Sequence, residues 1–223
     1  LTAPLGQQLI VDNRGSGVIP GVIVAKAAPD GYTLLVYGGT FLLSPLMMDQ
    51  PPYHPLKDFA PITLISSSPV VLVVHPAVTA NSVKELIALA KTKPGALNYA
   101  SASSGSASHL AGELFKAMSG TDFTRINYKG NGPAMLDMLG GRVQVMFVNA
   151  AAVTPHIKSG KLKALAVASA EPSALAPNVP TVSAAGVPGY EASSKIGMFA
   201  PARTPESIIR RLNQGAVRYI RTP

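Results

Sequence analysis

NYASASSGSASHLAGELFK, residues 98–116, is the stretch that decides how this chain is interpreted. Residues of β-prone type lead into a tract of Ser, Ala and Gly, and an amphipathic helix follows. Small residues let backbone N–H groups approach a ligand, and a helix start adds unpaired donors and a partial positive charge. The stretch therefore predicts a strand, a tight loop and an anion-binding helix start. The alternative is a serine-rich start that only caps its helix.

Two further junctions of the same kind follow. A glycine turn, Gly130-Asn131-Gly132, precedes a helix predicted over 133–140, and Pro133 suits a first helical turn. An apolar strand over 143–148 ends before Asn149, where small residues begin another helix. Such junctions form a ligand crevice where the carboxyl ends of parallel strands meet. No nucleophile or metal-ligating cluster accompanies them, so the sequence favours binding over catalysis.

The composition is that of a folded protein with a large core. The 223 residues are 47% hydrophobic and 13% charged, against a usual charged share of about a quarter. Cysteine is absent, which excludes disulfides, zinc–thiolate sites and a cysteine nucleophile. The formal net charge is +8, but the basic residues are dispersed and no recognised nucleic-acid-binding module is present. A basic anion- or nucleic-acid-binding module therefore stays a weaker alternative.

Strand and helix patterns alternate along the chain and predict an α/β fold with a largely parallel sheet. The expected strands are 8–11, 33–37, 62–66, 70–75, 97–101, 124–127, 143–148, 162–169 and 195–200. The expected helices are 18–28, 83–91, 106–118, 133–140, 151–159 and 207–220. Residues 47–61 and 172–189 are expected to form loops.

The histidines are the residues to test for catalysis. They lack metal-ligand spacing and predict no metal site: His54, His75, His109 and His156. His109 lies in the first turn of the helix after the serine tract, where it would contact an anion or a neighbouring loop. A small-ester hydrolase that uses Ser106, His109 and Asp137 is an alternative, although the chain has no G-x-S-x-G motif.

Short motifs are spread over almost the whole chain: AAPDGYTLL at 27–35, KDFAPI at 57–62, SVKELI at 82–87, LNYAS at 97–101, SHLAGELFK at 108–116, YKG at 128–130, PHIKSGKLKALAV at 155–167, VPTV at 179–182 and GVPGY at 186–190. Together they resemble the Bug-type substrate-binding proteins of tripartite tricarboxylate transporters. The resemblance implies a two-lobed, type II-like periplasmic-binding-protein architecture with a carboxylate ligand in the cleft between the lobes. It also implies a periplasmic protein, without catalysis or cofactor, that delivers its ligand to membrane permease subunits.

Mapped onto that architecture, lobe one comprises residues 1–73 and 197–223, and lobe two comprises residues 74–196. The crossover strands are Val70–Val74 and Ile196–Pro201, and hinge closure about them would trap the ligand. Backbone amides of the serine tract and its hydroxyls would hold one carboxylate. The predicted ligand-binding residues are Thr40, Ala102, Ser103, Ser104, Gly105, Ser106, Ala107, His109, Gly130, Asn131, Gly132 and Asn149. We expect a monomer that binds a small dicarboxylate, amino acid or aromatic acid.

The chain departs from the family pattern in four places. It begins after the strand and Pro/Gly-rich loop with which such proteins open, and it ends before segments that complete the first lobe, so it is expected to be truncated at both ends. Val148 stands where the family often has Asp, and Lys195-Ile196 stands where an aromatic residue is common. Valine cannot hydrogen-bond, so Val148→Asp is expected to strengthen binding of ligands with a hydroxyl or ammonium group.

Overall fold

The computed structural model describes residues 6–14 and 17–220 and divides the chain into two compact units. Unit 1 consists of Leu1–Ser67 with Lys195–Pro223, and unit 2 consists of Ser68–Ser194. The boundaries predicted from the sequence follow residues 73 and 196, a few residues downstream in each case. Residues 1–5, 15–16 and 221–223 of the expected first lobe lie outside the described part of the chain.

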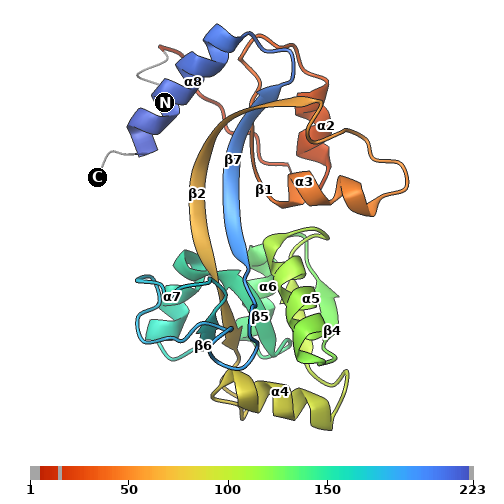
Figure 1. Ribbon diagram of the computed structural model, residues 1–223, viewed down its shortest axis with the longest axis vertical. Helices are drawn as coiled ribbons and strands as arrows, with labels where there is room; N and C mark the ends of the chain where they lie inside the picture. The colour runs from red at the N-terminus through yellow and green to blue at the C-terminus, as the bar shows by residue number, and fades with distance from the viewer. Residues whose placement is uncertain (1–5, 15–16, 221–223) are drawn as a thin grey trace. The chain divides into compact units, whose positions relative to one another are not determined.

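Unit 1 is built on strands in the hydrogen-bonded order β1–β7–β2, with β1 antiparallel to β7. Its strands are β1 (Leu35–Gly38), β7 (Ser193–Pro201) and the first part of β2 (Phe59–Val74). Its helices are α2 (Ile19–Ala25), α3 (Thr40–Leu43), the 3-10 turn Pro45–Met47 and α8 (Glu206–Ile220). In Figure 1, α2 and α3 lie on one side of these strands and α8 lies on the other.

Each face of the unit 1 strands has its own apolar cluster. On the α3 side, the ring of Phe41 is fully buried, with its centroid 4.6 Å from that of Phe59 and 4.7 Å from that of Phe199. On the other side, α8 contributes Leu212 and Ala216 to a cluster with residues of β2 and β7. Burial on both faces explains why these strands read as apolar runs in the sequence.

Unit 2 contains a mixed sheet in the order β6–β2–β5–β3–β4. Its further strands are β3 (Asn98–Ser101), β4 (Thr124–Asn127), β5 (Val145–Asn149) and β6 (Lys163–Val167). β3 is parallel to β4 and β5, whereas β2 is antiparallel to β5 and β6. The prediction of a largely parallel sheet is therefore wrong for β2, which runs antiparallel to both of its neighbours in unit 2.

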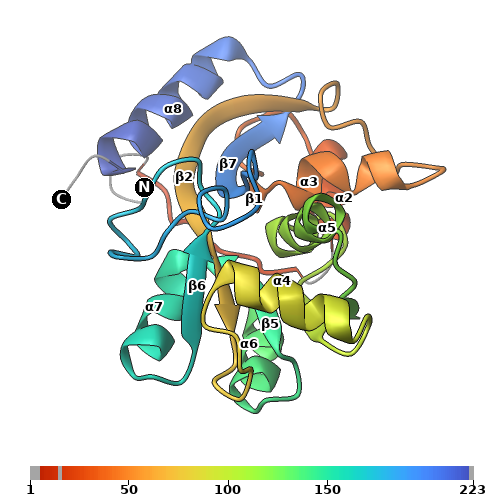
Figure 2. The ribbon, with the colours of Figure 1, turned by 60° about the horizontal axis from the view of Figure 1, so that its bottom comes forward.

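The helices of unit 2 cover both faces of its sheet (Figure 2). They are α4 (Val83–Thr92), α5 (Ala107–Ser119), α6 (Asn131–Leu139) and α7 (Ala150–Lys158). One cluster contains Leu86 of α4 and Phe115 of α5, and a second contains Met138 of α6 and Val153 of α7. No helix in the described residues has both the length and the apolar character that crossing a membrane requires.

Two strand predictions are wrong. Residues 62–66 and 70–75 are not separate strands, because β2 runs unbroken from Phe59 to Val74. The intervening serines, residues 66–68, are exposed or half-buried and lack apolar alternation, so their sequence resembles a loop. Residues 8–11 form no strand, since no described strand pairs with them, and Ile10 is 87% exposed.

Candidate functional site

Three helices of unit 2 begin at one edge of its sheet. β3, β4 and β5 are parallel, so their carboxyl ends lie at the same edge, and α5, α6 and α7 follow directly from them. The structure thereby places at this edge every predicted ligand-binding residue except Thr40. Thr40 is buried in unit 1 as the first residue of α3.

Residues 102–106, which we call the serine loop, form a compact turn with internal hydrogen bonds. Ser106 is the N-cap of α5, and its Oγ accepts the N–H of His109 at 3.2 Å. Ser108 Oγ accepts the N–H of Ala102 at 3.0 Å. Gly105 has a φ of 79°, which glycine adopts without steric cost, and its N–H donates to His109 Nδ1 at 3.1 Å. The loop is therefore held from both of its ends by the first turn of α5.

These bonds correct part of the predicted carboxylate contact. The amides of Ala102, Gly105 and Ser106 are bonded inside the loop, the last of them to the carbonyl of Ser103. They shape the loop instead of facing a ligand. The donors that suit an anion are the N–H groups of residues 107 and 108, because the first turn of an α-helix offers its amides no carbonyl partner.

The other two junctions present less defined groups. Gly130 is the N-cap of α6 and has extended backbone, and Asn131 and Gly132 are exposed residues of the first turn. Asn149 is half-buried as the N-cap of α7, and its side chain makes no capping hydrogen bond. These residues lie at the predicted edge of the sheet. The contacts within the described residues do not mark any of them as a ligand-binding group.

Arg125 is the functional candidate that the sequence analysis missed. It lies on β4 next to β3, and its Nε donates to the Oγ of the fully buried Ser101 at 2.7 Å. Its Nη1 donates to Ser104 Oγ, and its Nη2 donates to the Ala102 carbonyl and Asn127 Oδ1. The sequence does contain one signal that could have indicated Arg125. It is a positively charged residue two positions before the end of a strand that neighbours the serine tract.

His109 is buried under the serine loop and is held in its neutral form. Burial lowers the pKa of His109, and the charges of Arg125 and Lys116 lower it further, against an opposing effect of Glu113. Neutral imidazole can accept the N–H of Gly105 at Nδ1, whereas imidazolium cannot. His109 therefore supports the loop and is not placed as a ligand contact.

We expect acid to destabilise the fold through His109. Its folded pKa lies below the unfolded value of about 6.5, so its contribution to stability is complete above about pH 6.5 and is lost as the pH falls through the folded value. Chemical unfolding of wild type and His109→Asn between pH 5 and 8 measures this difference, because Asn does not titrate. His156→Asn is the control, and an equal change of slope in both variants would contradict the assignment.

The described residues do not form the Ser–His–Asp geometry that the hydrolase alternative requires. In the described residues, Ser106 Oγ bonds to the backbone N–H of His109 and lies 3.1 Å from Ser108 Oγ, and no bond joins it to the His109 ring. Asp137 binds Tyr128 at 2.8 Å and Arg142 at 2.7 Å instead. No base and no orienting carboxylate are thus assembled around Ser106.

The expected effect of Val148→Asp on ligand binding stays a prediction, and the structure adds where the residue lies. Its side chain is 2% exposed and belongs to the cluster with Met138 and Val153, on the face covered by α6 and α7. Alternation along β5 places Phe147 on the opposite face, in the cluster with α5. An Asp at position 148 would enter these apolar surroundings, which adds a cost in folding stability to any gain in affinity.

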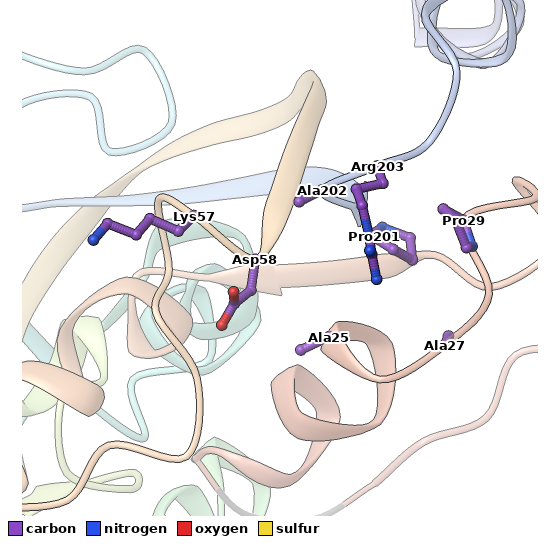
Figure 3. Close-up of a pocket in the computed structure, with 8 residues that line it drawn as sticks. All are labelled: Ala25, Ala27, Pro29, Lys57, Asp58, Pro201, Ala202 and Arg203. Atoms are coloured by element: carbon purple, nitrogen blue, oxygen red, sulfur yellow. The ribbon is translucent and has the colours of Figure 1, made fainter.

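A pocket of about 240 Å³ lies in unit 1, and none of the predicted ligand-binding residues lines it (Figure 3). Asp58 lines it and accepts the backbone N–H of His54 at 2.7 Å, while Lys57 points away from Pro201 and Arg203. No group of three or more His, Asp or Glu side chains in the described part of the chain could hold a metal ion. Neither this pocket nor a metal site in the described residues therefore competes with the serine loop as a ligand site.

Comparison with known proteins identifies the family. A model described as the tripartite tricarboxylate transporter family receptor matches residues 1–223. The chain belongs to this family. BugT of Bordetella pertussis is 40% identical over 214 residues, which cover 94% of this chain and 66% of BugT. The chain thus spans about two-thirds of the length of such a receptor.

Solved structures of similar receptors show the same fold. Rpa4515 of R. palustris, solved with adipate, is 33% identical with a TM-score of 0.94, over 99% of this chain and 75% of that one. MatC of Rhodopseudomonas palustris, solved with malate, is 32% identical with a TM-score of 0.93, over 99% of this chain and 76% of that one. The two-lobed α/β architecture predicted from the sequence is confirmed by these receptors.

Proposed function

We propose that this chain is the solute-binding receptor of a tripartite tricarboxylate-type transporter and captures a small carboxylate, with dicarboxylates as the first candidates. The observation that carries the proposal is the start of α5, where a serine loop and the first amides of a 13-residue helix meet at the edge of the sheet. The similar receptors solved with adipate and with malate support the dicarboxylate class.

Electrostatics at this edge favour an anion. The start of α5 carries a partial positive charge, and Arg125 adds a full one next to the serine loop. The acid nearest along α5, Glu113, accepts a hydrogen bond from the Tyr99 hydroxyl and pairs with Lys116 at 3.4 Å. Its negative charge is thereby offset, so a ligand carboxylate meets little repulsion.

Binding without chemical conversion agrees with the side chains present. Ser106, Ser108 and His109 hold the loop together, and nothing in the described geometry activates a nucleophile. The basic-module alternative gains no support either, because cations such as Arg142, Arg210 and Lys163 bind acidic side chains or carbonyls of the chain itself. A monomer in the periplasm that hands its ligand to permease subunits fits a transporter receptor.

The test is a thermal-shift screen of dicarboxylates, amino acids and aromatic acids. A ligand at a hundredfold excess over Kd stabilises the fold by about 2.7 kcal/mol, which corresponds to a rise in Tm of about 5 °C or more. We expect adipate or malate to produce such a shift. The diamide of the same acid is the control, since it has the same length without the charges.

A folded sample that shows no shift with any of these acids would contradict the proposal. An equal shift with acid and diamide would show that the site does not select carboxylates. Incubation with a model ester checks the hydrolase alternative directly, because turnover that disappears in Ser106→Ala would require a catalytic role.

A further inference from the structure

Arg125 connects the serine loop to two strand ends. Its Nε donates to Ser101 Oγ at the end of β3, its Nη1 donates to Ser104 Oγ in the loop at 3.3 Å, and its Nη2 donates to the Ala102 carbonyl at 3.3 Å. Nη2 also donates to Asn127 Oδ1 at the end of β4, at 3.0 Å. A planar guanidinium presents these donors in a fixed fork, so the partners are held in one geometry.

The charge of Arg125 is not neutralised by an acid. In the part of the chain that the structure describes, no carboxylate lies within ion-pair distance of its guanidinium. Its hydrogen-bond acceptors are hydroxyl, amide and carbonyl oxygens. The positive charge therefore stays available to a ligand while each of the three guanidinium nitrogens donates to the protein.

The serine loop needs such support. Gly105 in its middle has a φ of 79°, and glycine loses more conformational freedom on ordering than any other residue. The bonds to Ser108 and His109 hold the loop from the α5 side, and those from Arg125 hold it from the β4 side. A loop fixed in its binding geometry before the ligand arrives spares the ligand that ordering cost.

We propose that Arg125 is the positioning residue of the carboxylate site: it fixes the serine loop through Ser101, Ala102 and Ser104, so that the Ser104 hydroxyl and the α5 amides face the ligand together. The inference rests on the function proposed above. Arg125 acts through the loop and does not bind the ligand itself, which separates it from a direct arginine–carboxylate clamp.

The first test compares Arg125→Lys with wild type by titration calorimetry with adipate and malate. Lysine keeps the charge but loses the fork, so we expect affinity to fall about tenfold or more, as for loss of one charge-assisted hydrogen bond. Arg142→Lys is the matched control, because Arg142 is exposed and its guanidinium bonds Asp137 and no other side chain of the described residues. Wild-type affinity in Arg125→Lys would overturn the proposal.

The second test asks whether Arg125 acts through Ser104. Ser104→Ala is measured in the wild-type and Arg125→Lys backgrounds. A positioning role predicts that Ser104→Ala weakens binding clearly in wild type and much less in Arg125→Lys, because the hydroxyl is already misplaced there. Equal fold-losses in both backgrounds would overturn the proposal, since a direct ligand contact by Arg125 predicts that result.

A third variant covers the case in which Arg125→Lys folds poorly. Ser101→Ala removes the acceptor of the 2.7 Å bond, together with the 3.1 Å bond that Ser101 Oγ donates to the Ala102 carbonyl, and leaves the charge of Arg125 in place. We expect a smaller loss of affinity in the same direction, and unchanged affinity would overturn the proposal. A wild-type protein that binds no carboxylate would refute the proposed function instead, so the two failures are distinguishable.

Discussion

Phe115→Ala is expected to lower the free energy of unfolding by about 3–5 kcal/mol. Phe115 is fully buried on the sheet-facing side of α5. Its ring centroid lies 5.6 Å from that of Phe147 on β5, and 6.0 Å from those of Phe123 and Tyr190. Truncation would leave a cavity at the point where α5 is fastened to the sheet, and these neighbouring rings have little freedom to fill it.

Chemical unfolding of Phe115→Ala and Leu114→Ala measures the effect. Leu114 precedes Phe115 on the same helix but is 38% exposed, so it controls for the change in composition. We expect its truncation to cost less than about 1 kcal/mol, in line with substitutions away from the core. Similar losses in both variants would show that α5 does not pack through Phe115.

Gly112→Val is expected to destabilise the fold by about 3 kcal/mol and to weaken ligand binding as well. A Cβ at Gly112 would lie 2.4 Å from Cε2 of Tyr99, closer than real contacts allow. The Tyr99 ring is fully buried and its hydroxyl donates to Glu113, so it cannot turn away. The gain in helix propensity from replacing glycine is at most about 1 kcal/mol and does not offset the clash.

The effect on binding follows from the position of Gly112 on α5. A clash between α5 and β3 would push the first turn of the helix, including Ser106 and His109, away from the strand that carries the serine loop. Ala117→Val, on the exposed side of the same helix, controls for the β-branched side chain. Partial recovery in the double variant with Tyr99→Val would confirm the clash, and no recovery would contradict it.

Much of the fold can be predicted from local sequence patterns. Residues 98–116 form β3, the serine loop and the greater part of α5 as expected, because their apolar spacing, small-residue loop and capping serine agree with one another. β2 is predicted less well. Its serines at 66–68 resemble a loop, since nothing in the local sequence indicates that the strand continues through them.

The candidate site is harder to predict from local sequence patterns than the fold is. His109 is placed correctly in the first turn of α5, but its bond to Gly105 depends on how the loop folds back, which residue types do not encode. Arg125 lies 24 residues beyond Ser101, and alternation along a four-residue strand makes it look like a solvent-facing cation. The burial of Val148 is hard to predict for a related reason, because the face that a strand residue occupies depends on which helices cover each side.

The division of the chain has a consequence for the order in which it folds during synthesis. Unit 2 is one uninterrupted stretch, Ser68–Ser194, and it contains the serine loop together with Arg125. Unit 1 needs both its early residues and β7 and α8, which follow unit 2 in the chain. Because domains fold as units once their residues are available, we expect unit 2 to mature first. Its partner half stays incomplete until the chain beyond Lys195 emerges.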